Sequence, residues 1–212
     1  MEAMVNLEID GKQVKARQGM TVLEAAKESG VQIPTLCFHD KIMPYGACRV
    51  CSVEVGKKGG RVRVVAACGY PAEDGLVVKT RSPRIDKIRK TIVELVAPQA
   101  MFEGEVSGEL KEIADEYGAD IHRFESRLNV KPVRCILCGE CVRYCAEVVG
   151  ANAIGFVGRG IERRVVFFPE KASKVCPGCM GCFEICPTGK IAAEADGTYF
   201  GFTVDRFLAG TL

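Results

Sequence analysis

The chain has 212 residues, a length typical of one or two domains. Its formal net charge of +2, with no long run of like charges, argues against nucleic acid or a lipid surface as a partner. The sequence contains neither an apolar stretch long enough to span a membrane nor the N-terminal pattern of a secretory signal, so we expect a cytoplasmic protein.

The first part of the chain has the pattern of a β-grasp domain. Asp10 and Gly11 predict a hairpin turn between strands over 4–9 and 12–17. Thr21 is placed to cap a helix over 22–29, with Glu24 completing a capping box and Gly30 ending the helix. Further strands are expected over 49–55, 61–67 and 76–80.

The 12 cysteines point to metal binding, because disulfides are rare in a reducing cytoplasm. They fall into three sets of four, and no cysteine lies between the first set and the second. We therefore expect an N-terminal and a C-terminal metal region. The sets are Cys37, Cys48, Cys51 and Cys68; Cys135, Cys138, Cys141 and Cys145; and Cys176, Cys179, Cys182 and Cys186.

The first set reads C-x10-C-x2-C-x16-C. Its C-x2-C core with two outlying cysteines resembles the plant-type [2Fe-2S] ferredoxins, although those have a shorter first interval. We assign Cys37, Cys48, Cys51 and Cys68 to one [2Fe-2S] cluster, with a zinc ribbon as the alternative. A Rieske centre would need two histidine ligands, so we expect His39 to be a loop residue that tunes the cluster by a hydrogen bond.

A helical connector follows the first set. Ser82 and Pro83 predict a helix start, and the helix continues over 84–97 with Pro98 ending it. Its expected apolar face consists of Ile85, Ile88, Ile92 and Leu95 or Val96. A second helix over 108–117 closes at Gly118. The first of these helices is predicted to dock rather than to catalyse, and the acidic residues of the second are expected to form a solvated face.

The second and third sets both read C-x2-C-x2-C-x3-C, and each cysteine recurs 41 residues later. This is the spacing of bacterial-type ferredoxins, in which the fourth cysteine of each run ligates the other cluster. The β-branched and aromatic stretch between the runs predicts a strand or hairpin. We assign one [4Fe-4S] cluster to Cys135, Cys138, Cys141 and Cys186, and the other to Cys176, Cys179, Cys182 and Cys145.

This order of modules resembles one family closely. It is similar to the small iron–sulfur (diaphorase gamma-type) subunit of NAD-linked bidirectional hydrogenases, and to the N-terminal iron–sulfur region of iron-only hydrogenases and of the large complex I subunit. The stretch "KPVRCILCGECVRYCAEVVGANAIGFVGRG" carries much of the likeness. The family's further cluster, bound by one histidine and three cysteines, is not expected here, because residues 95–118 contain neither residue type.

The resemblance implies an α+β fold with three segments. These are a β-grasp [2Fe-2S] ferredoxin domain over 1–81, a helical connector over 82–129, and a two-[4Fe-4S] ferredoxin domain with a C-terminal tail over 130–212.

No nucleotide-binding or nucleophile motif is visible in the sequence. We therefore expect an electron-transfer subunit that is not catalytic alone. The resemblance implies a flavoprotein subunit that oxidises NAD(P)H as one partner. The other would be a hydrogenase, a formate dehydrogenase, or a ferredoxin in a bifurcating transhydrogenase. A free soluble polyferredoxin is the alternative, but such carriers are usually strongly acidic. A succinate-dehydrogenase-type subunit would have plant-type spacing, and a structural zinc protein is the non-redox alternative.

Overall fold

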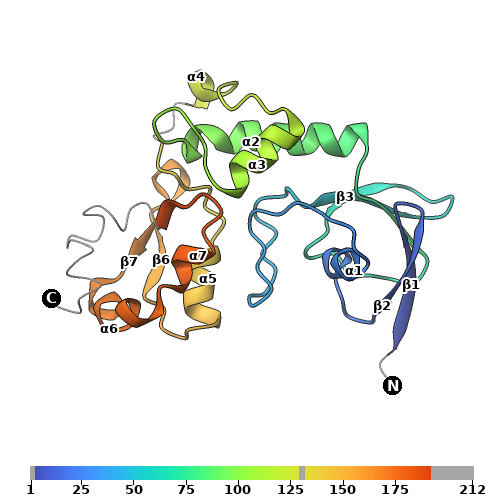
Figure 1. The fold of residues 1–212 in the computed structure, drawn as a ribbon, viewed down its shortest axis with the longest axis horizontal. Coiled ribbons are helices and arrows are strands. Elements are labelled where there is room, and N and C mark those ends of the chain that lie inside the picture. Colours follow the sequence, from blue (N-terminus) through green and yellow to red (C-terminus); the bar gives the residue numbers. More distant parts are fainter. Residues whose placement is uncertain (1–2, 129–131, 192–212) are drawn as a thin grey trace. The chain divides into compact units, whose positions relative to one another are not determined.

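The computed structural model describes residues 3–128 and 132–191 (Figure 1). These residues form two compact units. The first comprises the residues up to Phe38, Pro44–Leu95 and Ile113–Asp120; the second comprises His39–Met43, Val96–Glu112 and the described residues from Ile121 onward. Within the described ranges, no helix combines the length and apolar character needed to cross a membrane. The tail that was assigned to the C-terminal domain lies outside the described residues.

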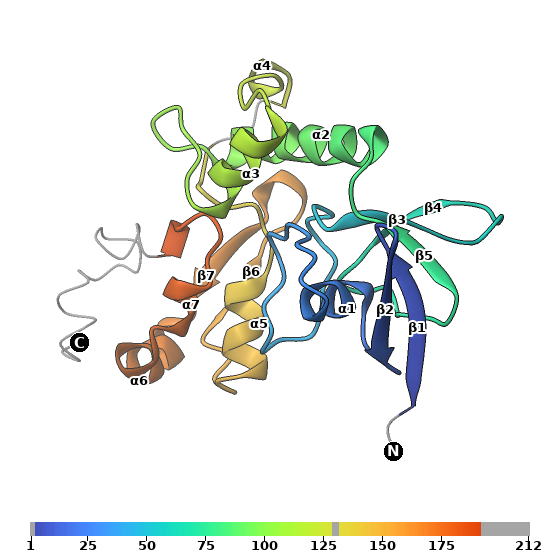
Figure 2. The same ribbon diagram turned by 45° about the vertical axis from the view of Figure 1, so that its right-hand side comes forward.

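The first unit is built on a mixed five-stranded sheet, which Figure 2 shows from the side of its first strands. Its strands are β1 (Met4–Ile9), β2 (Lys12–Arg17), β3 (Ser52–Lys57), β4 (Arg63–Ala66) and β5 (Leu76–Lys79). The order is β2-β1-β5-β3-β4, with β1 and β5 parallel and the other neighbours antiparallel. Together with helix α1 (Val22–Glu28), this sheet confirms the expected N-terminal α+β domain.

Two local predictions in this unit are confirmed. Asp10 and Gly11 both have positive φ, at 47° and 80°, as a two-residue hairpin turn requires. The Thr21 N–H donates to the Glu24 carboxylate at 2.7 Å, and the Glu24 N–H donates to the Thr21 hydroxyl at 3.2 Å, so the capping box is present. The apolar residues between sheet and helix include Leu7, Ile9, Val22, Ala26, Val53 and Val78, all buried.

Helix α2 (Pro83–Ala100) corrects two predictions. Pro98 was expected to end the helix but lies inside its last turn, where a proline removes only one helical hydrogen bond. The expected apolar face is only partly confirmed, since Ile85 is buried, Ile88, Ile92 and Val96 are half-buried, and the alternative Leu95 is 44% exposed. The fully buried stripe shares Ile85 with this face and continues through Arg89 and Val93 at intervals of four residues, each 0% exposed. Because the charged Arg89 occupies the middle of this core-facing stripe, a search for regularly spaced apolar residues does not find the stripe.

Two short helices follow α2. Helix α3 (Glu109–Tyr117) ends before Gly118, whose φ of 59° fits the predicted termination. Helix α4 (Glu125–Leu128) is a single turn.

The second unit contains a helix on either side of a hairpin in the chain order. Helix α5 (Glu140–Glu147) leads to strand β6 (Ile154–Val157), the 3-10 turn η1 (Gly160–Glu162) and strand β7 (Arg164–Phe167). Helices α6 (Pro169–Cys179) and α7 (Gly181–Glu184) follow. Strands β6 and β7 pair antiparallel, which confirms the predicted hairpin between the second and third cysteine sets. Helix α5 packs against β6 and α7.

Candidate iron–sulfur centres

The first cysteine set comes from three segments of the first unit. Cys37 follows α1, Cys48 and Cys51 lie before β3, and Cys68 follows β4. Cys48 is half-buried and the other three are buried. The structure brings all four thiols together, because the Cys48 N–H donates to the Cys37 sulfur at 3.4 Å and the side chains interact as described below.

The pKa values of these thiols reflect their mutual contacts. A hydrogen bond from the Cys68 thiol lowers the pKa of Cys51 to about 7, and the same bond raises the pKa of Cys68. A hydrogen bond with Cys37 likewise raises the pKa of Cys48. The charge of Cys37 also raises the pKa of both Cys51 and Cys68. The hydrogen-bonded pair Cys37 and Cys48 therefore lies close to the pair Cys51 and Cys68, and the four sulfur atoms form one group.

Four cysteines from both later runs line one cavity of the second unit: Cys135, Cys138, Cys141 and Cys186. The Leu137 N–H donates to the Cys135 sulfur at 3.4 Å. Burial raises the pKa of Cys141 well above its ordinary value, and the charges of the other three thiols raise it further. Cys186 therefore lies with the second run, although the sequence places it at the end of the third.

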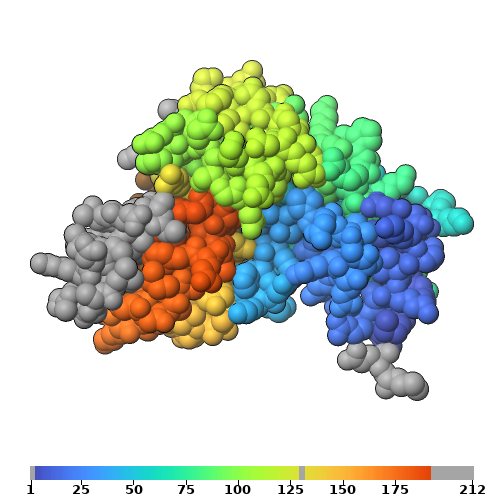
Figure 3. Space-filling view, viewed as in Figure 1, coloured from blue at the N-terminus to red at the C-terminus, as the bar shows by residue number. Residues whose placement is uncertain are grey.

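The remaining four cysteines, Cys145, Cys176, Cys179 and Cys182, line a second cavity of the same unit. The Ala153 N–H donates to the Cys145 sulfur at 3.2 Å. Burial raises the pKa of Cys182 to about 12 and that of Cys176 to about 11, and the charge of Cys145 contributes to both. Figure 3 shows the orange segment with the last cysteine run at the visible surface, and Cys179 is exposed.

Helix α5 supplies one cysteine to each cavity. Cys141 lines the first cavity and Cys145, one turn later, lines the second. Between Cys179 and Cys182, a β-carbon on Gly181 would overlap the ring of Tyr144, the neighbour of Cys145. At this position any residue other than glycine would require the Tyr144 ring to shift.

The donor sets fit iron–sulfur clusters. All 12 cysteines lie in the described part and are thiols rather than disulfides. Thiolates are the ligands of such clusters, but burial disfavours a thiolate that has no cationic partner. Cavities that are each lined by four thiols, two of them buried, with N–H groups donating to sulfur, therefore suit a metal centre that replaces the thiol protons.

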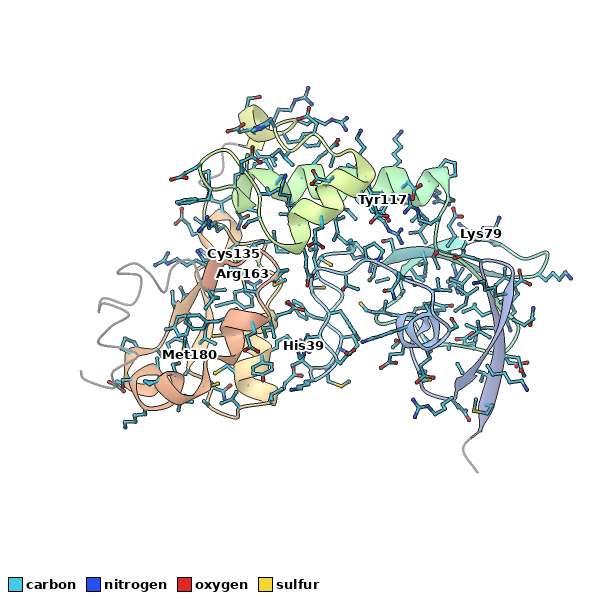
Figure 4. The ribbon with its side chains drawn as sticks, viewed as in Figure 1. His39, Lys79, Tyr117, Cys135, Arg163 and Met180 are labelled. Carbon is cyan, nitrogen blue, oxygen red and sulfur yellow. The ribbon has the colours of Figure 1, made fainter. Side chains whose placement is uncertain are left out.

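His39 belongs to the segment His39–Met43 of the second unit. Its Nδ1 accepts a hydrogen bond from the Lys41 N–H at 3.2 Å, and its ring meets the ring of Tyr144 edge-on at 5.8 Å (Figure 4). The Met43 N–H donates to the Glu147 carboxylate at 2.8 Å, and Arg143 donates to the Met43 carbonyl. The segment His39–Met43 is thus held by α5, and its predicted tuning of a cluster stays a prediction.

Sequence reasoning did not identify three buried polar residues that line the first cavity of the second unit, which are Glu140, Thr188 and Lys190. The buried Thr188 hydroxyl donates to the Arg134 carbonyl at 2.5 Å and lies 3.6 Å from the Cys186 sulfur. The buried Lys190 ammonium donates to the Val133 carbonyl at 2.6 Å. Both bonds tie the segment after Cys186 to the segment before Cys135. The only signal in the sequence is their closeness to a ligand.

Comparison with known proteins places this architecture in a family. Residues 2–83 match the family described as "2Fe-2S iron-sulfur cluster binding domain". Residues 126–192 match "NADH-quinone oxidoreductase subunit 3, ferredoxin-like domain". A chain in the crystal structure of an NAD+-reducing [NiFe]-hydrogenase in the H2-reduced state is 31% identical, with a TM-score of 0.66, covering 78% of this chain and 75% of that chain. The chain belongs to the family of iron–sulfur electron-transfer subunits of NAD(P)H-linked oxidoreductases. The resemblance drawn from the sequence is confirmed.

Longer relatives of this iron–sulfur subunit family match over nearly the same region. The NADPH-Fe(3+) oxidoreductase subunit alpha of Geobacter sulfurreducens is 37% identical over 208 residues, which cover 90% of this chain and 24% of that protein. The mitochondrial NADH-ubiquinone oxidoreductase 78 kDa subunit of Neurospora crassa is 32% identical over 212 residues. This match covers 91% of this chain and 28% of that protein. The chain therefore spans about a quarter of the length of these curated relatives.

Proposed function

We propose that this chain relays single electrons through three clusters. One [2Fe-2S] cluster would be held by Cys37, Cys48, Cys51 and Cys68. One [4Fe-4S] cluster would be held by Cys135, Cys138, Cys141 and Cys186, and another by Cys176, Cys179, Cys182 and Cys145. The observation that carries the proposal is the arrangement of the second unit, where two runs exchange their fourth cysteines between two cavities.

The chain's own residues prepare these sites for charge. Backbone N–H groups donate to the sulfurs of Cys37, Cys135 and Cys145, and such bonds stabilise negative charge on sulfur. Burial excludes water, which strengthens each of these interactions. Bound clusters of this kind accept and release one electron at a time. The protein thereby sets the potentials, while the redox chemistry belongs to the cofactor.

The proposed donor is a flavin-containing subunit that oxidises NADH or NADPH. Nicotinamide delivers two electrons as a hydride, so a flavin must stand between it and a one-electron carrier. The proposed acceptor is another redox subunit, such as a hydrogenase or a formate dehydrogenase, or a ferredoxin in a bifurcating complex. The names of the relatives support the nicotinamide link, since an NADPH, an NADH and an NAD+ enzyme are all represented.

Metal analysis tests the cluster content. Anaerobically purified protein is expected to contain about ten iron and about ten acid-labile sulfide per chain, from one [2Fe-2S] and two [4Fe-4S] clusters. Zinc in place of iron would refute the redox function. About fourteen iron would mean that the chain holds a further cubane that the three cysteine sets do not explain.

Reduction kinetics test the relay. The isolated chain is expected to stay oxidised with NADH or NADPH and to bleach with dithionite, because the flavin lies on another subunit. Adding the cognate flavoprotein should make reduction by one of the two nucleotides fast. Cys51→Ser should then block reduction of the cubanes while leaving them assembled, if electrons enter at the [2Fe-2S] cluster. Direct reduction of the isolated chain by NADH would contradict the relay.

A further inference from the structure

A fully buried arginine lies beside the first cysteine set. Arg89, in the part of α2 that belongs to the first unit, is 0% exposed. All three of its guanidinium nitrogens donate hydrogen bonds. Nε donates to the Val50 carbonyl at 3.1 Å and Nη2 to the Ser52 carbonyl at 3.0 Å, while Nη1 donates to the Tyr117 hydroxyl at 2.8 Å.

Two of these acceptors flank a proposed ligand. Val50 and Ser52 are the neighbours of Cys51, and both have buried side chains at 0% and 2% exposure. The planar fork of one arginine therefore holds the peptide groups on either side of Cys51. The Ala67 N–H donates to the carbonyl of Cys51 itself at 3.1 Å, so the backbone around this ligand is fixed on both sides.

The charge of Arg89 has no opposite charge among these contacts. A guanidinium stays protonated in proteins, and burying a charge is costly unless an opposite charge lies nearby. The three acceptors are neutral oxygens, and none of the hydrogen bonds of Arg89 to described residues reaches a carboxylate. By contrast, the exposed Arg81 forms ion pairs with Asp86 at 2.9 Å and Glu116 at 2.5 Å.

We propose that Arg89 is a positioning residue for the [2Fe-2S] site and the buried counter-charge that raises the reduction potential of its cluster. The inference rests on the proposed function, because it requires a cluster on the first cysteine set. Two ferric ions, two sulfides and four thiolates give a formal charge of about −2, and reduction adds one further negative charge. A fixed cation in a low-dielectric interior therefore stabilises the reduced form more than the oxidised form.

Tyr117 keeps the guanidinium in place from the side of α3. Its hydroxyl is the third acceptor, and its ring centroid lies 5.5 Å from the guanidinium carbon of Arg89 (Figure 4). Tyr117 thus helps to orient Arg89 but supplies no charge. Removing its hydroxyl should leave the potential nearly unchanged, whereas removing the cation should change it.

The test is an EPR-monitored redox titration of the full chain. It is recorded at a temperature at which the faster-relaxing [4Fe-4S] signals are broadened beyond detection and the [2Fe-2S] signal remains. Arg89→Met is expected to shift the [2Fe-2S] reduction equilibrium at least tenfold toward the oxidised form, which corresponds to about 59 mV lower potential for one electron. Arg89→Lys and Tyr117→Phe should stay within roughly threefold of the wild type, because both retain a cation. The matched control is Arg84→Met, which removes the same charge from the 62% exposed side chain on the same helix.

The outcomes separate this inference from the proposed function. A wild-type chain with no [2Fe-2S] signal would refute the function itself. A normal signal with an unchanged potential in Arg89→Met, or an equal shift in Arg84→Met, would overturn the role of Arg89. If Arg89→Met fails to assemble, Arg89→Lys decides. In Arg89→Lys, a retained cluster near the wild-type potential supports the charge, and a retained cluster whose equilibrium has shifted tenfold toward the oxidised form overturns it. A cluster lost in Arg89→Lys as well supports the positioning role, because a lysine retains the charge and not the fork.

Discussion

Gly108→Ala tests whether the connector braces the turn that carries Cys186. Gly108 has a φ of 62°, and a β-carbon there would lie 2.5 Å from the Pro187 carbonyl oxygen and 3.2 Å from the carbonyl carbon. Both atoms belong to the backbone, so no side chain can rotate away. The left-handed conformation costs about 1–2 kcal/mol for alanine. Displacing the Pro187 peptide adds about 1–3 kcal/mol, the usual range for overpacking.

Gly104→Ala is the matched control, because Gly104 has a φ of 83° but nothing within 4 Å of its added β-carbon. Gly104→Ala is destabilised only by the left-handed backbone conformation. The difference in stability between the two variants therefore measures the clash with Pro187. A difference of about 1–3 kcal/mol corresponds to a loss of cluster absorbance in mild denaturant that is roughly 5- to 160-fold faster. The cubane signal assigned to the cavity of Cys186 should disappear first. Equal rates in the two variants would refute the close approach of Gly108 to Pro187.

Two further predictions concern the second unit. Cys145→Ser should damage the cluster held mainly by the third run, and Cys186→Ser should damage the cluster held mainly by the second run. EPR spectra of each variant test this. Damage confined to the cluster of the run in which the substituted cysteine lies would contradict the exchange of ligands. Glu147→Ala should speed amide exchange of Met43 about three- to tenfold, because the Met43 N–H loses its acceptor. Glu162→Ala, in the 3-10 turn of the hairpin, is the control, and an unchanged Met43 exchange rate in Glu147→Ala would contradict the contact.

The cysteine spacing predicted the candidate sites because cluster geometry fixes which intervals a chain can use. The same holds for the first hairpin and the first helix, where Asp10, Gly11 and Thr21 act locally and their neighbours in sequence are their partners. The grouping of Cys186 with the second run followed from the known ligand exchange of two-cluster ferredoxins. None of these inferences required knowledge of distant packing.

The errors fall where distant packing decides. Pro98 lies in the last turn of α2, where its missing N–H removes one helical hydrogen bond. The Met101 N–H still donates to the Ala97 carbonyl at 2.9 Å, so the turn around Pro98 is retained. The buried face of α2 was only partly predicted because Arg89 occupies a core-facing position, and a search for apolar periodicity does not consider a charged residue. The acceptors of Arg89 come from residues 37 and 39 positions earlier in the chain and 28 positions later. No window of the sequence contains all of them.

The buried polar residues of the described chain offer a physical reason for these errors. Such residues are costly unless their partners are provided, so their positions mark where the fold serves another purpose. Ser52 and Arg89 lie at the loop of the first cysteine set, and Glu140, Thr188 and Lys190 line the first cavity of the second unit. Anionic clusters would offset the burial of the Arg89 and Lys190 cations, whereas the Glu140 carboxylate has the same sign as such a cluster. Burial, together with the charge of Glu140, raises the pKa of the Cys138 thiol. Under the proposed function, Arg89 interrupts the apolar pattern of α2 because it serves the same [2Fe-2S] site that the first cysteine set would hold.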